Sequence, residues 1–182
     1  MPSYQHLAYR RNAKAAARNQ QIKKPKNLET LQKAREDFGF FCDFVADKPP
    51  AIHHKEWNRR FITNEDSSCL IKIAGPNVDL LAPRGSAKST VLGLLTAWAI
   101  GIHTQAGLPL QILYLSYTVD IARSKSATIK RIIESKRYQE VFPKVRLLKN
   151  VTSNEYWSID HKFAGIDTTG EEQFTLCAAG LK

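Results

Sequence analysis

Apolar residues recur at helical spacing in the part of the chain that follows residue 27. Five of them are separated by alternating steps of three and four residues: Leu31, Ala34, Phe38, Phe41 and Val45. This spacing places them on one face of a single helix, for which Asn27 is the expected cap. Residues 47–50 break the pattern, and residues 51–63 (AIHHKEWNRRFIT) predict a second, shorter helix.

Short apolar runs replace this pattern from residue 69 onward. Residues 69–74 (CLIKIA) and 78–82 (VDLLA) predict strands, with a Gly75-Pro76 turn between them. Residues 86–102 then predict a helix that is apolar on nearly every side, as expected of a helix packed centrally against a sheet.

A second unit of strand and helix follows. Residues 110–115 (LQILYL) predict a strand, residues 120–136 a helix, and residues 174–178 (FTLCA) a further strand. The helix is expected to turn three apolar residues inward and four bases outward: Ala122, Ile129 and Ile133 against Arg123, Lys130, Lys136 and Arg137. The alternation of strands and helices predicts an α/β fold with a parallel sheet.

Composition adds a charge asymmetry to this picture. The chain is 43% hydrophobic and 24% charged, which excludes collagen, wholesale disorder and a disulfide scaffold. Its net charge is +10, and residues 1–28 hold many of the bases and no acid. This basic arm could bind nucleic acid, serve as a solubilising tail, form part of a helix face or act as an organelle transit peptide.

Three cysteines (Cys42, Cys69 and Cys177) lie far apart and lack the spacing of a zinc site, so we expect free thiols in a reducing compartment. The most apolar stretch, residues 91–102, is too short to cross a bilayer. No secretory signal is recognisable, and the sequence therefore predicts a soluble intracellular protein without a membrane partner.

Residues 79–90 (DLLAPRGSAKST) carry the pattern with the most chemical content. An apolar strand, a short loop and a helix that opens on Lys88, Ser89 and Thr90 form the setting that a phosphate-binding loop requires. Backbone amides and the helix N-terminus would surround a β-phosphate. Lys88 would reach the β- and γ-phosphate oxygens, and the Ser89 hydroxyl would bind Mg²⁺.

The loop departs from the standard G-x-x-x-x-G-K-S/T pattern, because Ala82 and Ala87 occupy the positions of the two glycines. Alanine reaches positive φ less readily than glycine, so we expect Gly85 to supply the required turn. The alternative is an ordinary connection between strand and helix, with Lys88 and Ser89 as solvated residues of the first turn.

The string APRGSAKST, with arginine before the central glycine, resembles the variant Walker A loop of bacteriophage terminase large subunits, the ATPases that pump DNA into viral capsids. Residues 112–135, 138–143 and 38–57 are also similar to segments of that family, so the resemblance spans about residues 28–181. It implies a P-loop NTPase-like fold of the RecA/ASCE type, in which helices flank a parallel sheet after a helical N-terminal segment.

The resemblance implies that ATP and Mg²⁺ are bound by a contiguous set of residues: Ala82, Pro83, Arg84, Gly85, Ser86, Ala87, Lys88, Ser89 and Thr90. Lys88 and Arg84 would be catalytic, with Arg84 acting as an arginine finger in cis that stabilises charge on the transferring phosphoryl group. The alternative for Arg84 is a helix-cap or DNA-facing charge.

Weaker candidates lie on either side of the loop. His53, His54 and Trp57 occupy the place where the family has an adenine-contacting element, and Trp57 could stack on the base or simply pack in the core. Three bases of the helix after the second strand could follow a DNA backbone or form a solvated face: Arg123, Lys130 and Arg131.

An ATPase of this class also needs a carboxylate pair after an apolar strand. Neither residues 156–160 (YWSID) nor residues 163–167 (FAGID) fit that pattern, and in the family it follows a segment similar to residues 174–181. We therefore expect a basic arm (residues 1–27), a helical lead-in (28–65) and an incomplete P-loop ATPase domain (66–182) that binds MgATP with little turnover.

By the resemblance, the complete protein would form a ring on the portal protein of the procapsid and receive double-stranded viral DNA from a small terminase subunit in the host cytoplasm. Two other functions stay open. One is a non-enzymatic nucleic-acid module with a vestigial loop, and the other is a different P-loop ATPase related to helicases or recombinases.

Overall fold

The computed structural model describes residues 28–63, 72–73, 80–149, 153–167 and 174–181. The chain divides into two units, residues 1–30 and 31–182, and the contacts given below belong to the second unit. The described residues form a mixed α/β structure with seven helices, a three-stranded sheet and a separate pair of short strands. The predicted helix cap Asn27 and the strand residues Cys69–Ile71 lie outside the described ranges.

The three-stranded sheet has the order β3–β5–β4. Strand β3 (Ile112–Ser116) runs parallel to β5 (Leu176–Gly180), while β4 (Tyr156–Trp157) pairs antiparallel with β5. Both strands predicted in this part of the chain are confirmed, each beginning two residues later than expected. The predicted parallel pairing is found between β3 and β5, but β4 makes the sheet mixed. Strand β4 was not predicted, because its two residues leave no alternating pattern in the sequence.

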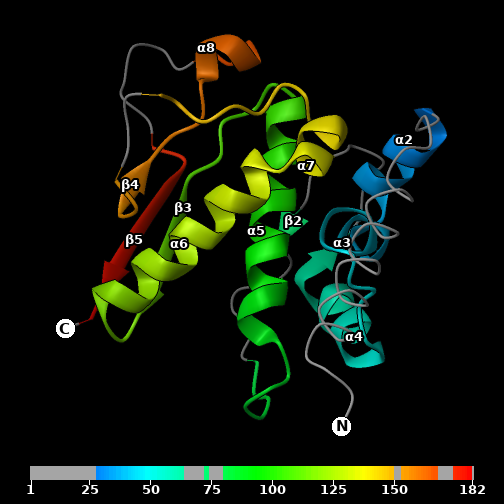
Figure 1. Ribbon diagram of the computed structural model, residues 1–182, viewed down its shortest axis with the longest axis vertical. Coiled ribbons are helices and arrows are strands. Elements are labelled where there is room, and N and C mark those ends of the chain that lie inside the picture. The colour runs from blue at the N-terminus through cyan, green and yellow to red at the C-terminus, as the bar shows by residue number, and fades with distance from the viewer. Residues whose placement is uncertain (1–27, 64–71, 74–79, 150–152, 168–173, 182) are drawn as a thin grey trace, which may run out of the picture. The chain divides into compact units, whose positions relative to one another are not determined.

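Helix α6 (Val119–Glu134) packs across β3 and β5, and α5 (Lys88–Gln105) packs against α6 (Figure 1). The side chain of Thr118 accepts a hydrogen bond from the Ile121 amide and caps α6. The predicted inward residues of α6 are confirmed as fully buried: Ala122, Ile129 and Ile133.

The opposite face of β3 carries leucines that remain accessible. Leu113 is 59% exposed and Leu115 is 54% exposed, whereas Ile112 and Tyr114 pack against the core. Where β5 ends, a Cβ on Gly180 would lie 2.8 Å from the carbonyl carbon of Thr118. The absence of a side chain at Gly180 therefore lets β5 approach the start of α6 closely.

The N-terminal helical region consists of α2 (Leu28–Glu36), α3 (Phe38–Ala46) and α4 (Ile52–Phe61). The predicted single helix over residues 31–45 is wrong. Asp37 is extended, with φ −117° and ψ 109°, and its carboxylate accepts a hydrogen bond from the Phe40 amide, so one helix ends and another begins there. The predicted apolar face still packs inward across this break, and the predicted helix over residues 51–63 is confirmed as α4.

Helix α3 contributes a buried thiol. Burial, together with the nearby carboxylates of Asp37 and Asp43, raises the pKa of the Cys42 thiol to about 12. Cys42 and Cys177 are both free, as predicted, and Cys69 lies outside the described ranges. Cys42 is therefore an unreactive core residue at neutral pH.

The remaining described elements are α7 (Lys136–Val141), α8 (His161–Ala164) and the antiparallel pair β1 (Ile62–Thr63) and β2 (Lys72–Ile73). Not all predicted outward bases are solvated: Arg137 donates to the Phe44 carbonyl at 2.8 Å and pairs with Asp47. In the described ranges, no helix combines the length and the hydropathy that a membrane span requires.

Candidate phosphate-binding loop

The loop before α5 lies at the end of the unit where β3 and β5 also terminate (Figure 1). In α/β proteins, ligands bind outside the carboxyl ends of parallel strands. The strand predicted over residues 78–82 is not found in its described part, because Leu80–Ala82 are in no strand and Leu81 is 95% exposed. Residues 78 and 79 lie outside the described ranges.

Two residues of the loop adopt left-handed backbone conformations. Gly85 has φ 85°, as expected from its lack of a side chain, and Ala87 has φ 57°. Gly85 therefore adopts the conformation expected of it, and Ala87 adds a second left-handed residue that was not predicted. Ala87 occupies the position of the second motif glycine and adopts the conformation that glycine favours, at a cost of about 1–2 kcal/mol.

The carbonyl groups of the loop are engaged by nearby donors. The Lys88 ammonium donates to the carbonyls of Ala82 and Pro83, at 3.0 Å for the latter. The Ser86 hydroxyl donates to the same Pro83 carbonyl at 2.9 Å. The Ser86 carbonyl lies 2.9 Å from Nε2 of His54, which is on α4. These contacts hold the carbonyls of residues 82, 83 and 86 in place.

Most amide groups of the loop, unlike these carbonyl groups, have no hydrogen-bond partner among the described residues. In the described part of the chain, no residue accepts a hydrogen bond from the backbone N–H of Gly85, Ala87, Lys88 or Ser89. Ala87 is the cap residue of α5 but provides no side-chain acceptor to the first turn. The loop therefore presents unpaired donors around the Lys88 ammonium, which favours an anionic ligand.

Helix α5 reinforces this preference. Its 18 residues place a partial positive charge, about half an elementary charge, at the end where Lys88 lies. Its first turn contains no acid that would oppose an anion. Ser89 and Thr90 are exposed beside Lys88, so their hydroxyl groups are accessible.

Arg84 is exposed at the turn of the loop. Of the acids in the described ranges, none forms an ion pair with it, and its guanidinium is available to a ligand. This position is compatible with either role predicted for Arg84.

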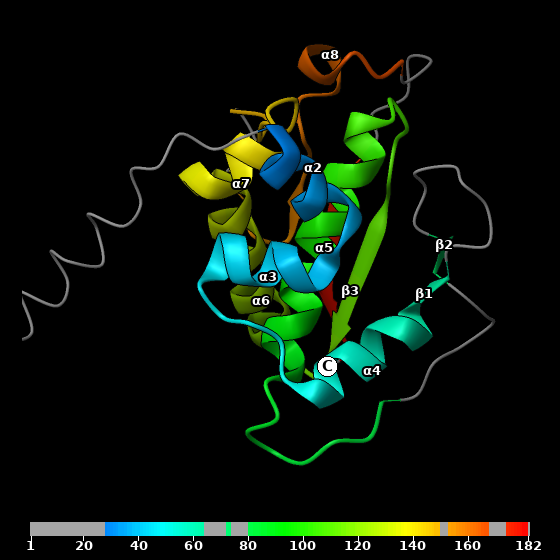
Figure 2. The same ribbon diagram turned by 90° about the vertical axis from the view of Figure 1, so that its right-hand side faces the viewer.

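Helix α4 passes beside the loop (Figure 2). The rings of His53 and His54 lie 5.0 Å from the ring of Trp57, and all three come from two consecutive turns of α4. Trp57 is half-buried and packs against the core. His54 is thus in direct contact with the loop, and His53 and Trp57 contact the His54 ring.

The bases predicted on α6 are largely occupied within the protein. Arg123 pairs with Asp120 at 3.1 Å and with Glu155. Lys130 donates to the Ser153 carbonyl at 2.6 Å and lies 5.9 Å from the Trp157 ring, and burial lowers the pKa of its ammonium. Arg131 bonds to Thr128 of the same helix. Arg123 and Lys130 therefore link α6 to the segment around β4, whereas Arg131 bonds within α6.

The described residues offer few side chains that could bind a metal ion. The described ranges contain no cluster of three or more His, Cys, Asp or Glu side chains that could hold a metal ion. Asp160 is used as a cap, since its carboxylate accepts a hydrogen bond from the Phe163 amide at 2.9 Å. The exposed Ser89 hydroxyl suits a magnesium ion whose other ligands come from phosphate and water.

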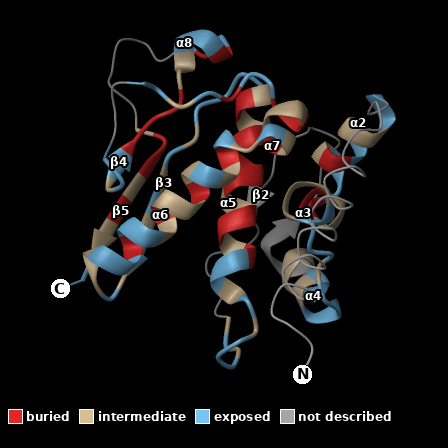
Figure 3. Ribbon diagram, in the orientation of Figure 1, coloured by how far each residue is buried: buried red, intermediate tan, exposed pale blue. Residues whose placement is uncertain are grey.

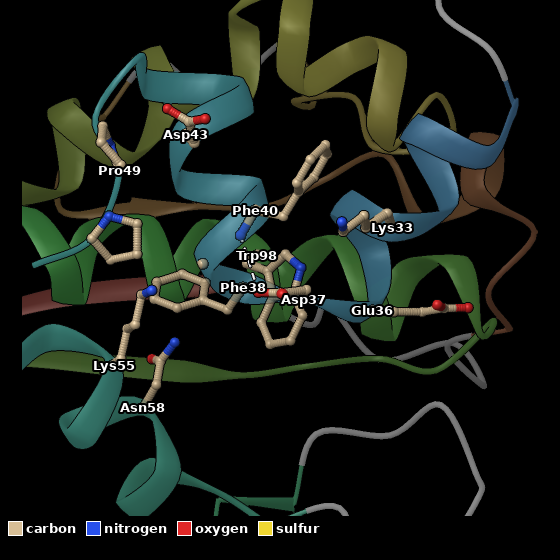
Figure 4. Close-up of a pocket in the computed structure, with 12 residues that line it drawn as sticks. Lys33, Glu36, Asp37, Phe38, Phe40, Asp43, Pro49, Lys55, Asn58 and Trp98 are labelled. Carbon is tan, nitrogen blue, oxygen red and sulfur yellow. Dashed lines mark hydrogen bonds between the residues drawn. The ribbon is translucent and has the colours of Figure 1, made fainter. Parts of the chain in front are cut away.

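A separate cavity of about 640 Å³ lies between α3, α4 and α5, and the sequence offered no sign of it (Figure 4). Its walls combine the aromatic rings of Phe38, Phe40 and Trp98 with charged groups that include Asp43 and Lys55. Asn58 also lines it, and the Oδ1 atom of this residue is buried without a hydrogen-bond partner.

The comparisons with known proteins identify no relative of this chain. Its sequence matches no protein-family model, and neither the curated proteins nor the solved structures include one that is detectably similar to it.

Proposed function

We propose that the loop over residues 82–90 binds the phosphates of ATP. The observation that carries the proposal is a difference between the backbone groups of the loop. The carbonyls of residues 82, 83 and 86 contact donors, whereas the amides of Gly85, Ala87, Lys88 and Ser89 have no acceptor in the described part of the chain. Such an arrangement around a lysine at a helix N-terminus stabilises a polyphosphate.

Each residue has a distinct part in this proposal. The amides of Gly85, Ala87 and Lys88 bind phosphate oxygens, and the Lys88 ammonium leaves the Ala82 and Pro83 carbonyls for the β- and γ-phosphates. The Ser89 hydroxyl holds Mg²⁺, which would neutralise phosphate charge when bound. Trp57, whose ring lies 5.0 Å from that of His54, would stack on the base.

Arg84 is the candidate for stabilising charge on the γ-phosphoryl group, because it is exposed at the turn of the loop and has no ion-pair partner in the described ranges. Hydrolysis also requires a carboxylate that orients water. Asp160 is committed to the cap of α8. We therefore propose MgATP binding as the activity of these residues, with slow turnover.

The wider proposal follows from the resemblance of residues 82–90 to the Walker A loop of phage terminases. In this proposal the described α/β unit is part of a P-loop NTPase-like domain in a viral DNA-packaging motor. The complete motor would act on double-stranded DNA at a portal, together with a small subunit. The central placement of α5 against α6 supports this fold.

The test is a titration of the purified chain with ATP in the presence of Mg²⁺, by calorimetry. We expect saturable binding that Lys88→Ala abolishes, because the variant loses the ammonium group proposed to bind the β- and γ-phosphates. Lys144→Ala is the matched control, since it removes an exposed lysine elsewhere and should leave affinity unchanged. Equal affinity in wild type and Lys88→Ala would disprove the assignment.

A DNA titration at several salt concentrations distinguishes a packaging ATPase from a non-enzymatic nucleic-acid module. A nucleic-acid module with a vestigial loop predicts DNA affinity that falls steeply with salt and is insensitive to both ATP and Lys88→Ala. A packaging ATPase predicts that ATP changes the DNA affinity and that Lys88→Ala removes this effect.

A further inference from the structure

His54 makes two hydrogen bonds that join the start of α4 to the loop. Its Nδ1 accepts a hydrogen bond from the Ala51 amide at 3.2 Å, and its Nε2 faces the Ser86 carbonyl at 2.9 Å. In return, the His54 amide donates to the Ala51 carbonyl at 3.0 Å. The imidazole therefore takes the place that a Glu or Gln side chain has in a capping box.

The two partners determine the state of the ring. An imidazole that accepts at Nδ1 and donates at Nε2 is neutral and carries its proton on Nε2. If Nδ1 carried the proton, two donors would face each other, because the Ala51 N–H already points at Nδ1. If Nε2 lacked a proton, two acceptors would face each other, because Nε2 points at the Ser86 carbonyl oxygen. Only one tautomer satisfies both contacts.

The contact with Ser86 also determines the direction of the next amide. In a trans peptide the carbonyl of one residue and the N–H of the next point in opposite directions, and the described peptide bonds contain no cis form. Because His54 draws the Ser86 carbonyl toward α4, the Ala87 N–H points away from α4. Ala87 then enters α5 in its left-handed conformation.

We propose that His54 is a positioning residue of the phosphate-binding loop. Its Nε2–H holds the Ser86 carbonyl outward and thereby keeps the Ala87 amide turned toward the phosphates. The expected effect of His54 on ATP binding rests on the proposed function, whereas the hydrogen bond between His54 and Ser86 does not. The neighbouring His53 contributes ring contacts to His54 and Trp57 and no hydrogen bond within the described ranges.

The first part of the test compares ATP affinity among four proteins. We expect His54→Ala to weaken ATP binding about fivefold, because the variant loses one hydrogen bond to the loop. His54→Gln, whose amide can donate to Ser86, should recover most of the affinity. His161→Ala, which removes a histidine from α8, is the control and should bind as wild type does. Thermal unfolding of each variant checks that the fold is intact.

Two outcomes of this comparison would overturn the proposal. One is wild-type affinity in His54→Ala while Lys88→Ala abolishes binding, because the loop would then work without the contact. The other is a His54→Gln variant that binds as weakly as His54→Ala, because the donor would then not be the property that matters.

The second part does not depend on nucleotide binding. In the full chain labelled with ¹⁵N, the ring nitrogen shifts of His54 should show a neutral imidazole protonated on Nε2, and His54→Ala should shift the amide signal of Ala87. A ring protonated on Nδ1, or an unchanged Ala87 signal, would overturn the proposal. If wild type binds no ATP but both spectral signatures are found, the proposed function fails while the positioning contact stands.

Discussion

The two ends of α5 differ in almost every physical property although they belong to one continuous helix (Figure 3). At the first turn, Ser89 and Thr90 are exposed, and the amides of Ala87 and Lys88 have no acceptor among the described residues. From Ala97 to Ile102 every residue is buried, with Phe142 packed over Gly101. Packing at the buried end sets the direction of the helix axis and thereby the direction in which the exposed end presents its donors.

The largest expected effect comes from removing an anchor of the buried end. Trp98 is 4% exposed, packs 5.4 Å from Phe38 and donates from Nε1 to the Ala34 carbonyl at 3.0 Å. Trp98→Ala should lower the free energy of unfolding by about 3–5 kcal/mol, measured by urea denaturation. Trp57→Ala, at a half-buried site beside the loop, should lower it by much less. Similar losses of unfolding free energy in the two variants would contradict the contrast between the buried end of α5 and the region of the loop.

An intermediate effect is expected from adding a methyl group to each of two glycines in α5. A Cβ at Gly101 would lie 2.6 Å from Cγ of Phe142, so Gly101→Ala should destabilise the protein by about 1–3 kcal/mol through overpacking. A Cβ at Gly93 would lie at an ordinary 3.8 Å from Ile129, so Gly93→Ala should stabilise the helix by about 0.5–1 kcal/mol. Thermal denaturation of the pair checks the signs, and matching signs would contradict the packing described for Gly101.

The smallest effect is expected from the same substitution, alanine to glycine, at the start of α5 and in its buried part. Ala87→Gly relieves the left-handed conformation at φ 57° but frees the unfolded chain, so a net gain of about 0.5 kcal/mol is expected. Ala97→Gly, in the buried interior of the helix, should cost about 1 kcal/mol. Urea denaturation of the two variants should therefore give opposite signs, and a clear loss in Ala87→Gly would argue against the left-handed residue at the start of α5.

Long, regular elements were predictable from the amino-acid sequence. The helices α5 and α6 and the strands β3 and β5 have enough residues for their apolar pattern to stand out, and the loop was recognisable from the order Gly85, Lys88 and Ser89. The break at Asp37 was not, because the spacing of apolar residues continues across it unchanged. Periodicity reports which face of a helix is buried and is insensitive to a single extended residue.

The candidate site was predictable in its residues and less so in its contacts. The motif indicated Lys88 as a phosphate ligand, but it could not show that Ala87 adopts a left-handed conformation. Likewise, His54 could be placed near the loop, yet its bond to the Ser86 carbonyl depends on how α4 packs, which is a tertiary property. Contacts of this kind leave no spacing in the sequence.

The positions of the three tryptophans give the protein an internal set of optical reporters. Trp98 and Trp157 are almost completely buried, so their emission should follow the loss of core packing. Trp57 is half-buried against two imidazole rings next to the loop, where its emission should respond to ligands and to histidine protonation. With Trp57→Phe as the reference, one fluorescence sample can therefore distinguish a change at the loop from unfolding of the core.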